Sequence, residues 1–187
     1  MPHIKNSTIM SKTNTFIFTI LQIVSWLIFT GLCVEAGGLL VNFIISLYKP
    51  EIVQNLYNKL DLSEMYNRSK SAYYYMYSFM LVISILKAVL FYVVSMLVST
   101  LDLAKPFNSS VSKQITQISY FYLSIGLLSY IARQSAKNLQ HRGYEIDQLN
   151  GFWVDSQAFI LMAAVVYIIA TIFKKGIEIQ KENDLTV

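Results

Sequence analysis

The sequence predicts an all-α fold: an integral membrane bundle of four transmembrane helices, with a short amphipathic helix between the first two. Three observations predict it. Hydrophobic residues make up 55% of the chain and charged residues only 14%, a balance too apolar for an ordinary soluble domain. The mean hydropathy is +0.46. Long stretches also run almost without charge, and about 20 apolar residues in a helix cross a hydrocarbon core of about 30 Å.

We expect a single transmembrane domain over residues 1–187, placed in the lipid bilayer of the cell membrane as a multi-pass protein. The spans are predicted at about 15–47, 72–100, 112–133 and 152–174, followed by a polar C-terminal tail at 175–187. One cysteine, Cys33, excludes an intramolecular disulfide, and no clustered ligand residues suggest a metal or a cofactor. The net charge is +4, but the basic residues are dispersed, which argues against direct nucleic-acid binding.

The first span has Glu35 as its only charge. Gly37 and Gly38 offer a place for a kink, and Pro50 fixes the far end of the helix. A cleavable signal peptide is an alternative interpretation of this region. The apolar pattern continues well beyond Ala36, the residue expected at a cleavage site, so we favour an uncleaved span.

The segment 49–71 is more polar, and its apolar residues recur at helical spacing. This pattern predicts a short amphipathic helix that lies on the membrane surface or against the bundle. Asp61 followed by Glu64 resembles a capping box at the start of the next helix. Four tyrosines then predict an aromatic belt at the membrane interface: Tyr73, Tyr74, Tyr75 and Tyr77.

The second span holds Lys87 near its centre, on the same helix face as Ser84. A lysine at mid-bilayer costs roughly 2.5 to 3.5 kcal/mol, so it usually faces protein or water and has a partner. Glu35 lies at a comparable depth if the first two spans are antiparallel neighbours, which makes Glu35 and Lys87 candidates for an intramembrane charged pair. Two interpretations stay open: a structural bridge between helices, or a site for a substrate, ion or proton.

The third and fourth spans are also predicted from helix-end signals and from polar residues on one face. Pro106 stops any helix in the connection at 102–113, and Asn108 is a good N-cap for the third span. Small and polar residues near one face of that span predict a helix contact: Thr116, Ser119, Gly126, Ser129 and Arg133. In the fourth span we expect Trp153 as an interface anchor and Asp155 near the helix N-terminus, where a carboxylate is favoured.

The ending GIEIQKENDLTV at 176–187 and the KPFN turn at 105–108 resemble a family of small bacterial four-span inner-membrane proteins of unknown function. Members of that family are often encoded beside a helix-turn-helix regulator. The resemblance implies the four-span architecture and a cytoplasmic helix-turn-helix regulator as partner. It also implies that the turn and tail matter through five residues: Pro106, Phe107, Glu182, Asp184 and Leu185. Glu35 and Lys87 match no motif of the family.

Three classes of function remain. We favour a non-enzymatic sensor or accessory protein that acts with a cytoplasmic transcriptional regulator. The alternative is a small transporter or channel that uses Glu35 and Lys87. An enzyme ranks last, because His3 and His141 lie in polar segments and no phosphate-binding glycine loop is present. We expect both termini in the cytoplasm, although the basic residues divide seven to seven between the two sides. Four spans with small-residue faces fit either a monomer or a homo-oligomer.

Overall fold

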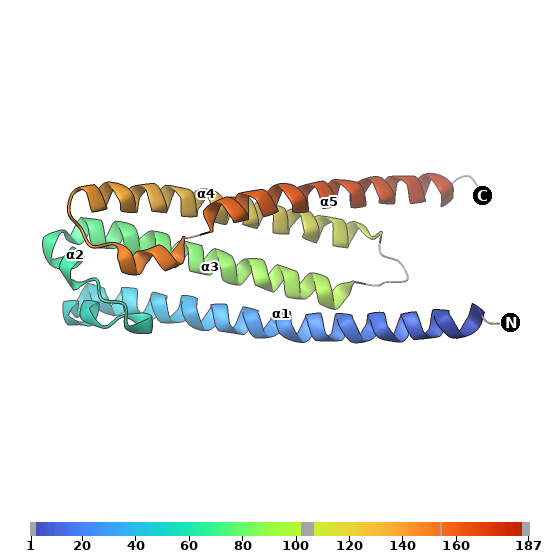
Figure 1. Ribbon diagram of the computed structural model, residues 1–187, viewed down its shortest axis with the longest axis horizontal. Helices are drawn as coiled ribbons and strands as arrows, with labels where there is room; N and C mark the ends of the chain where they lie inside the picture. The colour runs from blue at the N-terminus through green and yellow to red at the C-terminus, as the bar shows by residue number, and fades with distance from the viewer. Residues whose placement is uncertain (1–2, 102–106, 154, 185–187) are drawn as a thin grey trace.

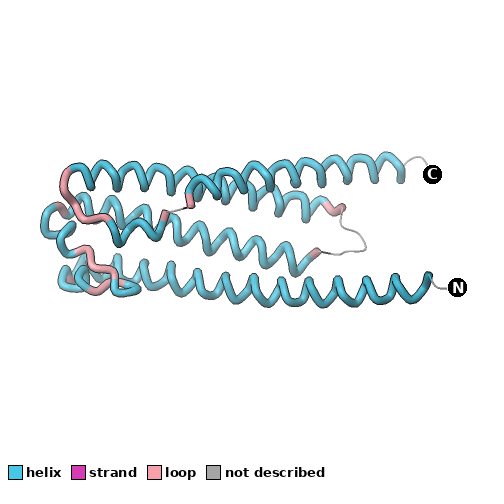
Figure 2. Tube along the Cα trace, in the orientation of Figure 1, coloured by secondary structure: helices cyan, strands magenta, loops and turns pink. Residues whose placement is uncertain are grey.

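The computed structural model describes residues 3–101, 107–153 and 155–184, with side chains from Phe16 to Asn183 inside these ranges. Within them every regular element is a helix (Figures 1 and 2). The α-helices are α1 (His3–Tyr48), α2 (Ser63–Arg68), α3 (Lys70–Thr100), α4 (Ser109–His141) and α5 (Ser156–Asp184). Three 3₁₀ helices accompany them: η1 (Pro50–Gln54), η2 (Tyr57–Lys59) and η3 (Asp147–Phe152).

Four helical segments are long and apolar enough to cross a membrane: Phe16–Tyr48, Lys70–Thr100, Ser109–His141 and Asp147–Asn183. The predicted all-α, four-span class is therefore confirmed, and it is the class of a multi-pass membrane protein. In Figure 1 the long helices run along one axis, and both chain termini lie at the same end. We call this end the terminal end, and the opposite end, formed by residues 49–69 and 142–153, the loop end. Helix α1 packs on α3, α3 on α4, and α4 on α5.

Helix α1 is continuous from His3 to Tyr48, so the kink predicted at Gly37 and Gly38 does not form. A Cβ atom at Gly37 would meet nothing within 4 Å. A Cβ atom at Gly38 would collide with the ring of Tyr57 in η2. Gly38 is thus needed for close contact between α1 and the loop end rather than for bending.

The connection between α1 and α3 is helical in short pieces, η1, η2 and α2, instead of one amphipathic helix. The backbone turns at Asn58 and Lys59, whose φ angles are 57° and 59°, and left-handed residues of this kind end a regular helix. Three residues of the predicted apolar face are nevertheless buried, at 6% exposure or less: Val53, Leu56 and Leu60.

The capping box predicted at Asp61 and Glu64 does not form, since Leu62 is the N-cap of α2. Instead the Ser63 N–H donates to Asp61 Oδ1 at 2.9 Å. Hydrogen bonds from the side chain and backbone of Ser63 hold the pKa of the Asp61 carboxyl below its usual value. The Glu64 carboxylate accepts from the Glu145 N–H at 3.2 Å, which joins the two connections of the loop end.

The hydrophobic core is densest near the loop end, around the first half of α3. Tyr73 and Tyr77 are fully buried, so the predicted tyrosine belt is wrong for these two residues, whereas Tyr75 is 50% exposed. The Tyr77 hydroxyl donates to the Leu39 carbonyl of α1 at 2.9 Å. The Tyr75 hydroxyl forms a 3.0 Å hydrogen bond with the Ser135 hydroxyl of α4. Tyr77 and Tyr75 therefore join α3 to α1 and to α4.

Helix α5 begins partway along α4 rather than at its end (Figure 1). The first residues of α5 lie against Gly126, because a Cβ atom there would be 3.2 Å from the Ser156 carbonyl oxygen and 2.6 Å from Ile160 Cγ1. Helix α4 continues from Gly126 for another 15 residues, to His141. The segment 142–153 thus folds back into the bundle, and Trp153, predicted as an interface anchor, is buried at 2% exposure.

Three residues of the polar face predicted for the third span, Ser119, Gly126 and Ser129, pack inward, whereas Arg133 is exposed. Ser119 and Ser129 are each 2% exposed, and Gly126 between them meets α5. Small side chains allow this close helix contact, as is usual inside membranes. At its other end α5 continues as one helix through Gly176 to Asp184, so most of the predicted polar tail is helical.

Candidate functional site

Glu35 lies on α1 and faces α3. Its Oε1 atom accepts a hydrogen bond from the Ser84 hydroxyl at 3.2 Å, and the residue is half-buried. Ser84 itself is 1% exposed. A carboxylate inside an apolar helix pair is stabilised when a hydroxyl donates to it, which accounts for the polar face shared by these helices.

Lys87 is one turn further along α3 and points to a different neighbour. Its Nζ atom donates to the main-chain carbonyl of Phe152 at 3.5 Å, at the long limit of a hydrogen bond. Phe152 ends η3, in the connection that folds back into the bundle. Non-helical backbone at membrane depth is tolerated where protein satisfies its polar groups. Lys87 provides such a donor to the connection.

The depth of Lys87 follows from the pairing of α3 with α4. Thr100 Oγ1 lies 3.4 Å from the Gln114 side chain, and Tyr75 bonds Ser135 at the other end of the contact. Lys87 falls between these two contacts. Lys113 and Arg133 bracket the charge-free part of α4, about 30 Å long at a rise of ~1.5 Å per residue. Lys87 therefore lies well inside the apolar zone, as the sequence predicts.

The two intramembrane charges do not form an ion pair with each other. In the part of the chain whose side chains are described, the ion pairs are Glu64 with Arg68 and Lys175 with Glu178. Glu35 accepts from the Ser84 hydroxyl, and Lys87, about one turn further along α3 than Ser84, donates to the Phe152 carbonyl. The structure thus gives each charge a local structural partner, and any functional use of either charge stays a prediction.

The turn and the tail named by the family resemblance meet at the terminal end. The ring centroids of Phe107 and Phe173 are 5.5 Å apart. A Cβ atom at Gly176 would lie 2.6 Å from the Phe107 ring, so a glycine is needed for that ring to seat on α5. We call this contact between Phe107, Phe173 and Gly176 the turn–tail joint. Pro106 and Leu185 lie outside the described residues.

The remaining tail residues continue α5 beyond the joint. Glu182 is exposed, and Asp184 is the last residue of the helix. Lys175 Nζ contacts Glu178 Oε2 at 2.7 Å on this segment. We call Gly176–Asp184 the α5 extension. Because it is helical and anchored at its base by Phe107, it presents a fixed polar surface at the terminal end.

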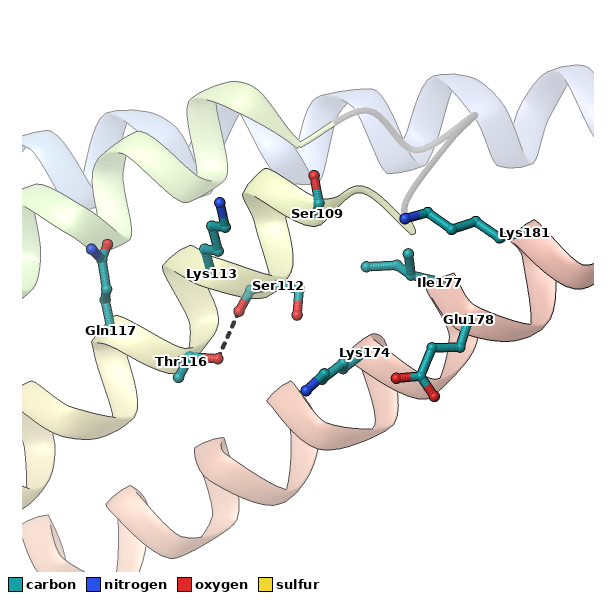
Figure 3. A pocket seen from close by; sticks show the side chains of 9 residues that line it. All are labelled: Ser109, Ser112, Lys113, Thr116, Gln117, Lys174, Ile177, Glu178 and Lys181. Atoms are coloured by element: carbon teal, nitrogen blue, oxygen red, sulfur yellow. Dashed lines mark hydrogen bonds between the residues drawn. The ribbon is translucent and has the colours of Figure 1, made fainter.

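A groove of about 560 Å³ lies between the start of α4 and the end of α5 (Figure 3). Lys113 of α4 and Lys174 and Lys181 of α5 line it, together with Glu178 and the hydroxyl residues Ser109, Ser112 and Thr116. Sequence reasoning missed this groove, because it treated the lysines as separate membrane-boundary charges. The available signal was the seven-residue spacing of Lys174 and Lys181, which places both on one helix face.

Four carboxylates gather at the loop end, where Asp61, Glu64, Glu145 and Asp147 line a smaller cavity of about 230 Å³. Two of them are already engaged by backbone N–H groups. Among the described residues no group of His, Cys, Asp or Glu is arranged to hold a metal ion.

A family model described as protein of unknown function, DUF2975, matches residues 57–187. The chain belongs to this family. No curated protein and no solved structure matches the chain. The expectation of an uncharacterised family is therefore confirmed.

The DUF2975 match begins at Tyr57, so α1 and Glu35 lie before it. Lys87, the turn–tail joint and the groove lysines all lie inside it. The matched segment thus contains the contacts at the terminal end and the Lys87–Phe152 contact, whereas Glu35, the partner that the sequence predicted for Lys87, lies outside it. This division favours the terminal end as the place to look for a function common to DUF2975 proteins.

Proposed function

We propose that this DUF2975 protein is a non-enzymatic sensor or accessory protein of the bacterial inner membrane, which contacts a cytoplasmic helix-turn-helix regulator through its terminal end. The turn–tail joint is the observation that carries the proposal. Phe107 and Gly176 come from two distant segments, each with residues that the family resemblance singles out, and they lie in contact. A protein partner requires a surface of fixed shape, and the joint fixes the base of the α5 extension.

The chemistry of the α5 extension supports a protein contact. Its residues 179–183 are exposed, and it carries both signs of charge and continues in helical form past the apolar part of α5. Charged surfaces of this kind steer and select partners more than they add affinity. The proposal places this surface in the cytoplasm, where a transcriptional regulator is found, and therefore places both termini there as well.

A small transporter that uses Glu35 and Lys87 is the second candidate. The observation in its favour is the presence of two ionisable side chains at membrane depth. Each of them already bonds a local partner, which gives both a structural use. The terminal end therefore ranks first.

The proposal predicts that a helix-turn-helix regulator co-purifies with the full-length protein from solubilised membranes of its own host. Deletion of residues 177–187 should abolish recovery of the regulator, because the exposed part of the extension is lost. Lys137→Gln, a change on α4 near the loop end, is the matched control and should leave recovery unchanged. The thermal unfolding midpoint of each variant shows that the bundle is intact. Equal recovery with the shortened and full-length proteins would contradict the proposal.

A further inference from the structure

The groove at the terminal end is lined by cationic side chains from two helices (Figure 3). Lys113 comes from α4, and Lys174 and Lys181 come from α5. None of the three forms an ion pair with a described residue. Glu178 also lines the groove, but Lys175 contacts its carboxylate at 2.7 Å and offsets its charge. The acidic Glu182 lies on the same extension and is exposed. The balance of charge in the groove is positive.

Hydroxyl side chains also line the groove. Ser112 is 9% exposed and lines the groove together with Ser109 and Thr116. The Thr116 hydroxyl already donates to the Ser112 carbonyl at 2.9 Å. The Ser112 hydroxyl can donate to a ligand in the groove.

The start of α4 adds to the positive field. Its first turn contains no acidic residue, and Asn108 caps it by accepting from the Ser110 N–H at 2.9 Å. A helix N-terminus favours an anion. Together with three lysines and the Ser112 hydroxyl, this end of α4 has the donor set that phosphate oxygens accept from.

The groove lies where apolar helix surface gives way to charge. Lys113 precedes the charge-free segment of α4, and Lys174 follows that of α5. A small apolar cluster lies between the same two helices and consists of Val111, Ile115 and Ala170. Basic pockets between transmembrane helices at this depth bind phospholipid head groups.

We propose that this groove binds a phosphate group, held by Lys113, Lys174 and Lys181 and by the Ser112 hydroxyl. A phospholipid head group and a soluble phosphate ester share this chemistry, and the position at the apolar boundary favours the head group. The inference goes beyond the proposed function and stands without it, because it concerns ligand binding by the purified protein. A failure of the regulator to bind would not contradict phosphate binding in the groove.

The test uses the full chain purified in detergent and measures the affinity for short-chain phosphatidylglycerol, phosphatidylcholine and inorganic phosphate. Phosphatidylglycerol should bind, and Lys113→Gln and Lys174→Gln should each weaken it by about tenfold, the effect of losing one charge-assisted hydrogen bond. Phosphatidylcholine should bind more weakly, because its choline cation faces the lysines. Binding of inorganic phosphate at comparable affinity would identify a soluble phosphate ester as the ligand instead of a lipid.

Ser112→Ala and Lys137→Gln complete the experiment. Ser112→Ala removes the serine hydroxyl from the groove with little change of volume and should weaken phosphatidylglycerol binding, whereas Lys137→Gln removes a lysine of α4 far from the groove and should not. The substituted lysines are exposed, so their variants should unfold at the wild-type temperature. The inference is overturned if no phosphate compound binds, or if Lys137→Gln weakens binding as much as Lys174→Gln does.

Discussion

Replacing Trp153 by alanine should lower the free energy of unfolding by about 3–5 kcal/mol, the usual cost of removing a large buried aromatic side chain. Trp153 is 2% exposed and belongs to the main core cluster. It directly follows Phe152, whose carbonyl accepts from Lys87. The cavity left by the indole would loosen the connection that folds back into the bundle. Unfolding in detergent, followed by circular dichroism, measures the effect.

Two further variants make the Trp153 result specific. The indole Nε1 of Trp153 is buried without a hydrogen-bond partner, so Trp153→Phe should cost much less than Trp153→Ala. Trp26 on α1 is 39% exposed, and Trp26→Ala should change stability by about 1 kcal/mol or less. Equal losses for Trp153→Ala and Trp26→Ala would show that the segment 142–153 does not pack inside the bundle.

Replacing Gly126 by valine should separate α5 from α4 and destabilise the protein by about 1–3 kcal/mol or more. A Cβ atom at this position would be 3.0 Å from the Ile160 backbone nitrogen and 3.2 Å from the Ser156 carbonyl oxygen. Backbone atoms of a helix cannot move aside as a side chain can, so the whole of α5 would shift. The thermal midpoint of unfolding in detergent measures the loss.

Gly37→Ala is the matched control for Gly126→Val. A Cβ atom at Gly37 meets nothing within 4 Å, and alanine is favoured over glycine inside a helix by roughly 0.8–1.0 kcal/mol. We therefore expect Gly37→Ala to be neutral or stabilising. If Gly126→Val were tolerated equally well, the close contact between α4 and α5 would be absent.

The number of spans could be predicted from the sequence because each apolar segment is long and nearly free of charge. Single residues near the loop end were harder to place. Tyr73 and Tyr77 look like interface residues by composition, but α1 and the 49–69 connection cover them, and no local pattern encodes that tertiary contact. Trp153 was misplaced for the same reason: a short polar segment gives no sign that it folds back beside α4.

The candidate site was predictable only in part. Lys87 stood out because charge is costly at membrane depth, yet its partner is a main-chain carbonyl, and every residue has one, so the sequence could not name Phe152. Glu35 was assigned to Lys87 because opposite charges attract, whereas the helix packing brings Ser84 to it instead. The groove was missed because Lys113 and Lys174 are 61 positions apart in the chain and meet only through the α4–α5 contact.

The side of the membrane on which the α5 extension lies is the most direct test of the proposed function. In a Cys33→Ala background, Asn183→Cys marks the extension and Asn55→Cys marks the loop end, and both positions are exposed. A membrane-impermeant thiol reagent is added to intact bacterial spheroplasts and, separately, to lysed ones. We predict that Asn55→Cys reacts in both samples and that Asn183→Cys reacts only after lysis. Labelling of Asn183→Cys in intact spheroplasts, with Asn55→Cys protected, would contradict contact between the extension and a cytoplasmic regulator.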